Sequence, residues 1–268
     1  MLRLAVRVRR EQAELVLAEL LVLAPSGVEE VEAGESVEFA IYGPPGELPA
    51  LPDLRAVAGG APVEVTTAEL PDGWADRWRA FHKPLVLGER LTVRPPWEPQ
   101  AGTGIDLVID PGQAFGTGAH ASTRLCLELM LELPRHAGAF VDLGCGSGVL
   151  ALAASKLGWE PVLALDNDPA SVQAATVNAH ANGVAIDVRR LDLRDDPVPG
   201  AATIVANLLA PLLIDWAPRV PSAAERLIAG GVLMGEADRV AGEFSAAAGL
   251  CESARRTCGE WAALVLER

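Results

Sequence analysis

Hydrophobic and polar residues alternate along the first quarter of the chain as expected for strands, with one amphipathic helix among them. A Pro/Gly-rich stretch within this part hides at most one further short helix. The order strand, helix, two strands, helix, strand predicts a small ferredoxin-like α+β domain over 1–67. The expected elements are strands at 2–8, 27–34, 36–43 and 62–67 and helices at 11–23 and about 47–58.

From residue 105 onward, short apolar strands alternate with amphipathic helices. Uninterrupted apolar strands are typical of a parallel sheet that helices cover on both faces. Two strands joined by a tight turn near Gly259 end the chain and would add an antiparallel pair to the edge. The pattern therefore predicts an α/β domain over 98–268. Its expected strands are 105–110, 139–144, 161–168, 185–192, 201–209 and 230–237, and its helices 121–133, 148–157, 169–183, about 211–229 and about 238–248.

The segment 68–97 joins the two predicted domains. A short helix there would place Trp74, Trp78 and Phe81 on one face, where these aromatic side chains can simply hold the domains together. A strand follows in "ERLTVRPPW" and is stopped by the two prolines that begin at Pro95. We expect an interdomain linker with a short helix.

Composition and charge narrow the possible partners. The 268 residues carry 22 basic and 36 acidic side chains, a net charge of −14, which disfavours direct nucleic-acid binding and favours a basic protein or peptide. The four cysteines lack metal-ligand spacing, so we expect no metal site and a reducing cytoplasm. Acidic residues interrupt the apolar N-terminal stretch, and no run is long enough to span a membrane.

A glycine loop, residues 144–148, stands between a predicted strand and helix in "VDLGCGSGVLALAASKLG". Glycines let a backbone approach a ligand closely, and a helix N-terminus offers free N–H groups. The spacing of Gly144, Gly146 and Gly148 is G-x-G-x-G. A dinucleotide fingerprint would place its third glycine where Val149 stands, so a pyrophosphate ligand is disfavoured.

Polar residues end the next three strands. Asp166, twenty-two residues beyond Gly144, is placed to accept hydrogen bonds from ribose hydroxyls, whereas Asp168 suits a helix cap. Asp192 could approach an adenine amino group, or it could belong to a solvated charge run. Asn207 ends a strand beside the point where the strand order reverses. It could cap a helix, or its carbonyl oxygen could accept from a substrate amine.

These features together resemble class I S-adenosylmethionine-dependent methyltransferases, and more closely the PrmA family, the methyltransferases of ribosomal protein L11. The motifs that carry the resemblance follow in order and cover about 70–268; residues 1–67 match only in outline. Ser122 stands where the family more usually has threonine. The matching segments are "GWADRWRAFHKPLVLGERLTVRPPW", "DPGQAFGTGAHASTRLCLELM", the glycine loop, "ALDNDPASVQAATVNAHANGV" and "VANLLAPLL".

The resemblance implies a seven-stranded Rossmann-like sheet and the cofactor S-adenosyl-L-methionine. It implies a ferredoxin-like N-terminal domain that docks the protein substrate L11. The segment 112–123 would lie over the methionine end of the cofactor, and the glycine loop would hold the nucleoside. The histidine at 120 is expected to hold backbone rather than act as a base. The residues implied to bind the cofactor or wall its site are Thr123, Gly144, Gly146, Asp166, Asn207, Phe115, Gly116 and Asp192.

Methyl transfer from a sulfonium needs an aligned, uncharged amine but no acid, because the leaving group is neutral. Asn207 would orient that nitrogen as the catalytic residue, since an amide accepts a hydrogen bond without titrating. The expected activity is methylation of α-amines, ε-amines or both on L11. Three alternatives stay open: another protein lysine or a nucleic acid as substrate, a non-catalytic cofactor-binding protein, and a nucleotide-dependent oxidoreductase. "NLLA" lacks the aromatic residue that would stack on a flipped base, and Val149 disfavours the oxidoreductase.

Overall fold

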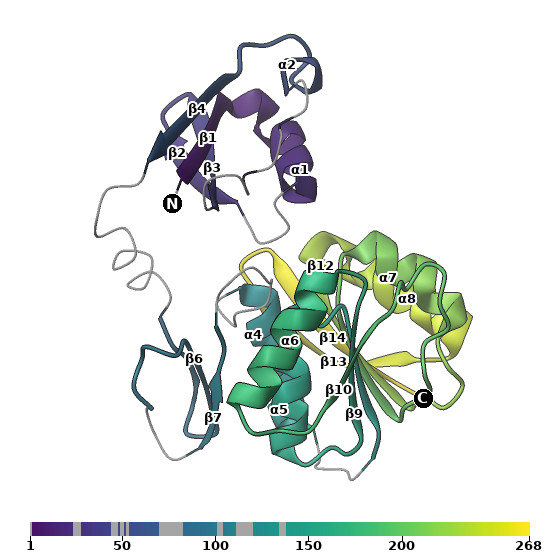
Figure 1. Cartoon of the computed structure of the whole chain (residues 1–268). Helices are drawn as coiled ribbons and strands as arrows, with labels where there is room; N and C mark the ends of the chain where they lie inside the picture. The colour runs from purple at the N-terminus through teal and green to yellow at the C-terminus, as the bar shows by residue number, and fades with distance from the viewer. Residues whose placement is uncertain are drawn as a thin grey trace. The chain divides into compact units, whose positions relative to one another are not determined.

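The structure is a computed structural model, shown in Figure 1, in which the chain divides into two compact units, Met1–Phe81 and His82–Arg268. Each unit is described by itself. The residues that the structure describes are 2–23, 28–43, 48, 51, 54–69, 83–100, 104–110, 120–133 and 138–268.

The first unit contains a four-stranded antiparallel sheet in the order β2-β3-β1-β4, which confirms the predicted ferredoxin-like arrangement. The alternation of the strands places Val6 and Phe39 on one face, where they pack with Val16 and Leu20 of the helix in a core of their own. Its elements are β1 (Leu2–Arg9), α1 (Ala13–Leu23), β2 (Glu29–Ala33), β3 (Ser36–Gly43), α2 (Leu54–Val57) and β4 (Glu64–Glu69). The expected helix with Trp74, Trp78 and Phe81 lies outside the described residues.

A three-stranded sheet opens the second unit: β5 (Leu85–Leu87), β6 (Leu91–Arg94) and β7 (Ile105–Val108). Its middle strand ends before Pro95, as predicted. The expected strand at 105–110 exists as β7, but it pairs with β6 and is not part of the main sheet. The partly buried Arg94 guanidinium contacts both carboxylate oxygens of Asp106 at 2.8 Å and ties these two strands together.

The main sheet has seven strands in the order β10-β9-β8-β11-β12-β14-β13. The first five are parallel, and β14 runs antiparallel between β12 and β13. The strand order reverses between β8 and β11, the point at which open α/β sheets bind ligands. The elements are α4 (Ala121–Glu132), β8 (Phe140–Leu143), α5 (Val149–Leu157), β9 (Val162–Asp166), α6 (Pro169–Ala181), β10 (Asp187–Arg190), β11 (Thr203–Asn207), α7 (Ala210–Trp216), β12 (Arg226–Leu233), α8 (Ala237–Ala248), β13 (Cys251–Cys258) and β14 (Trp261–Glu267).

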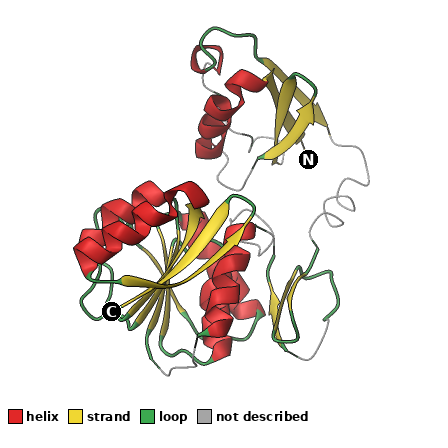
Figure 2. Ribbon diagram, turned by 180° about the vertical axis from the view of Figure 1, so that it is seen from behind, coloured by secondary structure: helices red, strands yellow, loops and turns green. Residues whose placement is uncertain are grey.

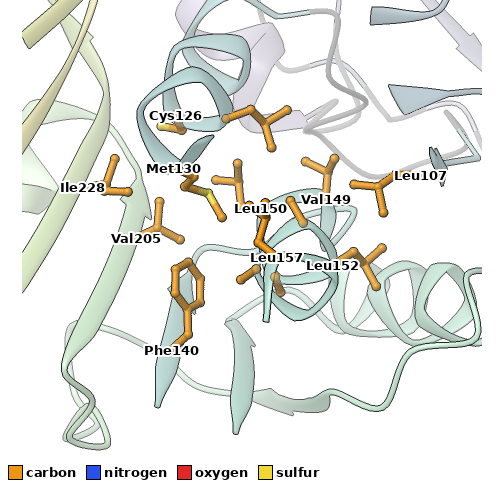
Figure 3. Packing of buried hydrophobic residues seen from close by; sticks show 14 of the residues in the cluster. Leu107, Cys126, Met130, Phe140, Val149, Leu150, Leu152, Leu157, Val205 and Ile228 are labelled. Carbon is orange, nitrogen blue, oxygen red and sulfur yellow. The ribbon is translucent and has the colours of Figure 1, made fainter. Parts of the chain in front are cut away.

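Helices cover both faces of this sheet, with α4, α5 and α6 on one side and α7 and α8 on the other (Figures 1 and 2). Figure 3 shows the first of the two cores, in which Phe140, Val205 and Ile228 of three neighbouring strands face Met130 of α4 and Leu150 of α5. The sheet is therefore held between two apolar layers, as its continuous apolar strands predicted. In the part of the chain that the structure describes, no helix is both long and apolar enough to cross a bilayer.

Two predicted elements differ from the structure. The strand expected at 230–237 is β12, which lies four residues earlier, and a 3-10 turn occupies Met234–Glu236. The helix expected over about 211–229 ends at Trp216 and continues only as one 3-10 turn to Arg219, and β12 already begins at Arg226. Pro218 and Pro221 explain the early end, because proline lacks the N–H that a helix interior needs. The predicted helix 238–248 and the terminal strand pair are confirmed.

Candidate active site

The glycine loop leaves the carboxyl end of β8 and leads into α5. Gly144, Gly146 and Gly148 all have positive φ, at 69°, 52° and 81°, which side chains other than glycine adopt only with strain. A Cβ on Gly144 would also lie 2.4 Å from the Leu208 Cδ2 atom, so the Leu208 side chain would have to move. The loop therefore needs glycine for its conformation, and at Gly144 it packs directly against the Leu208 side chain.

Asp166, at the tip of β9, is bonded directly to this loop. Its Oδ2 accepts the N–H of Gly146 at 2.9 Å, and its Oδ1 accepts the N–H of Asp168 at 3.0 Å. Each carboxylate oxygen has a second lone pair and can accept another hydrogen bond. Partial burial raises the pKa of Asp166, and the two backbone donors oppose that rise. Asp168 caps α6 by accepting from Ala170, as predicted.

An open hollow lies between the ends of β8, β9 and β10 and the start of α7. Leucines make up much of its lining, and two carboxylates, one amide and one guanidinium provide its polar part. The Asp192 carboxylate lies at this hollow and accepts the N–H of Arg194 at 3.0 Å. The structure therefore brings Gly144, Asp166 and Asp192 together around one space. The lining residues are Leu143, Gly144, Leu165, Asp166, Asn167, Leu191, Asp192, Leu193, Arg194, Leu208 and Leu212.

Asn207 is the last residue of β11, the strand that pairs with β8 on the side away from β9. Its Nδ2 donates to the hydroxyl oxygen of Thr123 in the first turn of α4, at 3.3 Å, so these two predicted site residues meet although they are 84 positions apart. Its Oδ1 is buried and has no hydrogen-bond partner among the described residues. Gly230 on β12 leaves room for this amide, since a Cβ there would lie 3.0 Å from Oδ1.

Asp142 was not predicted as a site residue. It is completely buried in β8, and its Oδ2 accepts the N–H of Ala151 at 3.0 Å, in the first turn of α5, where the N-cap Gly148 has no side chain to do so. Its Oδ1 has no partner among the described residues, and burial raises its pKa to about 7. The pairing of Val205 with Asp142 places Asp142 and Asn207 on one face of the sheet. A polar residue inside an apolar strand was the signal in the sequence.

His120 caps the helix that carries Thr123. Its Nδ1 accepts the N–H of Ser122 at 3.3 Å and lies 2.8 Å from the Ser122 hydroxyl, so the predicted backbone-holding role is confirmed. Burial lowers its pKa. The ring packs edge-on against Trp261 of β14, with centroids 4.8 Å apart. Phe115 and Gly116 lie outside the described residues, and their roles stay predictions.

The parallel sheet with one reversed strand, the glycine turn after β8 and the carboxylate at the tip of β9 together define a class I methyltransferase, an enzyme that uses a methyl donor of the S-adenosylmethionine type. The chain belongs to the ribosomal protein L11 methyltransferase (PrmA) family, whose model matches residues 54–268.

Relatives support the same assignment. The chain is 40% identical over 223 residues to a ribosomal protein L11 methyltransferase of Symbiobacterium thermophilum, which covers 80% of this chain and 72% of that protein. It is 38% identical over 248 residues to one of Halorhodospira halophila, covering 90% and 84%. Among solved structures, a ribosomal protein L11 methylase from Lactobacillus delbrueckii subsp. bulgaricus matches with a TM-score of 0.62 and 28% identity, over 69% of this chain and 98% of that one.

Proposed function

We propose that this chain transfers methyl groups from S-adenosyl-L-methionine to α- and ε-amines of ribosomal protein L11. One observation carries the proposal: the Asn207 carbonyl oxygen is buried without a partner among the described residues, at a strand end next to the glycine loop. An unsatisfied buried acceptor is costly, which is why such groups occur mainly where a ligand supplies the missing donor.

The residues around the hollow and at the strand ends suit the methyl donor S-adenosylmethionine. Bound there, S-adenosylmethionine would supply a methyl group on a positively charged sulfur that leaves as a neutral thioether. Asp166 has lone pairs free for two hydroxyl groups, and the leucines of the hollow offer an apolar surface to a base, with Asp192 at its edge. The unpartnered oxygens of Asp142 and Asn207 suit the positive charge of the methionine end. Gly144, Gly146 and Thr123 complete this set, and Phe115 and Gly116 are proposed to wall the transfer site.

The amine must reach the site without its proton. A lysine with a pKa of about 10.4 is neutral in only about 0.04% of molecules at pH 7, and an α-amine with a pKa of about 8 in roughly 10%. Burial and a nearby positive charge both lower the pKa of an amine. The Asn207 oxygen can then accept one N–H and aim the nitrogen lone pair. The amide cannot take up the proton itself, so this residue orients the nucleophile and does not act as a base.

The family supports the proposed protein substrate, and the free thiols support the proposed compartment. L11 is the substrate in the names of the relatives, and the net charge of −14 suits a substrate that presents lysines. The cysteines Cys126, Cys145, Cys251 and Cys258 are all free thiols, which agrees with the proposed cytoplasmic location.

The test is methylation of purified L11, followed by mass spectrometry of the intact substrate and its peptides. Asn207→Ala should lower kcat by about 100-fold, because it removes the group that aligns the amine. Thr176→Ala on the exposed surface of α6 serves as a control and should leave kcat unchanged. Parent enzyme that binds the donor but methylates another protein or a nucleic acid instead of L11 would contradict the proposed substrate.

A further inference from the structure

Two asparagines on α6 lie one turn apart, and the proposed mechanism uses neither of them. Asn178 is 3% exposed, and Asn182 is the C-cap of the helix. Both carboxamides are directed at the end of β7, about 70 residues earlier in the chain. This is the strand that leads toward the segment preceding α4.

β7 is an edge strand of its three-stranded sheet, so one side of its backbone has no neighbouring strand there. The N–H groups of Ile105 and Ile109 face β6, where they donate to Arg90 and Arg94. Val108 and Asp110 stand on either side of Ile109 in the chain and must therefore direct their backbone groups outward. Without partners, such edge groups would have to bond to water or remain unsatisfied.

The two asparagines supply those partners. The Asn182 Oδ1 accepts the N–H of Val108 at 2.8 Å, and its Nδ2 donates to the carbonyl of the same residue at 2.7 Å. The Asn178 Oδ1 accepts the N–H of Asp110 at 3.2 Å. The carboxamides at positions i and i+4 of the helix thus bond to alternate residues of the strand, as a neighbouring strand would.

Asn178 differs from Asn182 in its second contact. The Asn178 Nδ2 donates to the carbonyl oxygen of Ser147, inside the glycine loop, at 2.9 Å. The corresponding Nδ2 of Asn182 donates to Asn178 in its own helix. The helix also packs closely on the loop here, since a Cβ on Gly148 would lie 3.0 Å from the Ala175 Cβ. Of the two asparagines, Asn178 is the one that links β7 with the glycine loop.

We propose that Asn178 is a positioning residue for the methyl donor, which it serves by fixing the glycine loop through the Ser147 carbonyl while it fixes the end of β7 through Asp110. The inference rests on the proposed function, because it assumes that the glycine loop holds the donor. Asn178 acts through the loop and does not touch the donor itself. Two sequence-distant segments are thereby set in one geometry before any ligand binds.

The expected effect on S-adenosylmethionine binding follows from the hydrogen bond that the glycine loop loses. Replacing Asn178 with alanine removes the Nδ2 group that donates a hydrogen bond to the Ser147 carbonyl oxygen. Ser147 is fully buried, and its oxygen loses that bond. The loop can then take other conformations, and donor binding must restore the competent one. The binding-competent fraction falls, and the apparent Kd rises in proportion. One lost buried hydrogen bond corresponds to a rise of about five- to tenfold.

The experiment compares Asn178→Ala with Asn182→Ala in the full-length protein. Asn182→Ala is the matched control, because it removes two bonds to β7 but none to the glycine loop. Isothermal calorimetry with S-adenosylmethionine should give a Kd five- to tenfold higher for Asn178→Ala and within twofold of the parent for Asn182→Ala. In steady state, the KM for the donor should rise while the KM for L11 stays constant.

A second variant keeps the test decisive if Asn178→Ala folds poorly. Asn178→Asp retains an oxygen for the Asp110 N–H. When ionised, it has no N–H to donate to Ser147, so it should also raise the Kd for S-adenosylmethionine. An unchanged Kd in a folded Asn178 variant, or an equal rise in the Asn182 control, would overturn the inference. Parent protein that fails to bind S-adenosylmethionine would instead refute the proposed function, and the parent measurement separates the two failures.

Discussion

Asp166 is the residue whose exchange should act most directly on the methyl donor. Asp166→Asn keeps the shape of the side chain but loses the charge and acceptor sites with which the carboxylate would hold two hydroxyls. Charged hydrogen bonds contribute about 1.5–3 kcal/mol each, so the Kd for S-adenosylmethionine should rise by about 10- to 100-fold.

Calorimetry against a matched control checks this expectation. Asp187→Asn exchanges another carboxylate, on the exposed strand β10, where its partner is Arg189 and not the glycine loop. That variant should bind the donor like the parent. Equal donor affinity in Asp166→Asn and the parent would remove Asp166 from the proposed site.

Asp142 predicts a pH dependence of stability. Its pKa is raised by burial from an ordinary 3.8 to about 7 in the folded protein. Between these values the folded state keeps a proton that the unfolded state has released. The free energy of unfolding should therefore fall as the pH rises from about 4 to about 7, by up to about 4 kcal/mol at 1.36 kcal/mol per unit, and this contribution should level off above pH 7.

Urea unfolding at a series of pH values, with Asp142→Asn beside the parent, measures this contribution. The variant carries no proton that titrates at this position, so its stability should change less than that of the parent across this window. Asp187→Asn again serves as the control and should follow the parent. Parallel pH profiles for the parent and Asp142→Asn would show that the buried carboxyl does not titrate in this window.

At the scale of elements, the contact between α4 and β12 depends on a missing side chain. A Cβ on Gly230 would lie 2.3 Å from the Cys126 Sγ and 3.0 Å from the Asn207 Oδ1. Gly230→Ala must therefore displace the buried Cys126 sulfur, which α4 carries, and shift the Asn207 amide. Overpacking of this kind costs about 1–3 kcal/mol of unfolding free energy, and kcat should fall as Asn207 loses its contact with Thr123.

A double-mutant cycle separates the two contacts. Adding Cys126→Ala removes the sulfur and should restore most of the lost stability, measured by urea unfolding, while kcat stays low because the clash at Asn207 remains. The single exchange Cys126→Ala provides the reference for the cycle. Strictly additive losses of stability would mean that the new methyl group and the sulfur do not compete for space.

Among the helices and strands, some features could be predicted from the sequence and others could not. Continuous apolar strands identified the parallel sheet, and Gly144, Asp166 and Asn207 were placed at strand ends because period and turn residues are local signals. The three-residue strand β5 is too short to show alternation, and the pairing of β7 with β6 could not be predicted because pairing is a long-range property. The contacts of Asn178 and Asn182 with β7 were missed for the same reason, since they join segments 68 and 74 positions apart.

The whole molecule consists of two units with separate cores. The core of the first unit draws on residues between Leu4 and Val63, and those of the second on residues between Leu85 and Leu266. The residues around the hollow, together with Thr123 and Asn207, all belong to the second unit. Donor binding should therefore need only His82–Arg268, whereas recognition of a protein substrate can draw on both units.

Removing the first unit tests this division. A fragment spanning 82–268 should bind S-adenosylmethionine with a Kd within about twofold of the full chain, because it keeps every described residue of the proposed donor site. Its kcat/KM for L11 should fall about tenfold or more, since binding energy from contacts remote from the reacting amine is lost. Calorimetry and mass spectrometry give the two readouts, and circular dichroism confirms that the fragment is folded.

A folded fragment that methylates L11 as fast as the full chain would show that the ferredoxin-like unit does not dock the substrate. A folded fragment that fails to bind the donor would mean that the first unit completes the donor site.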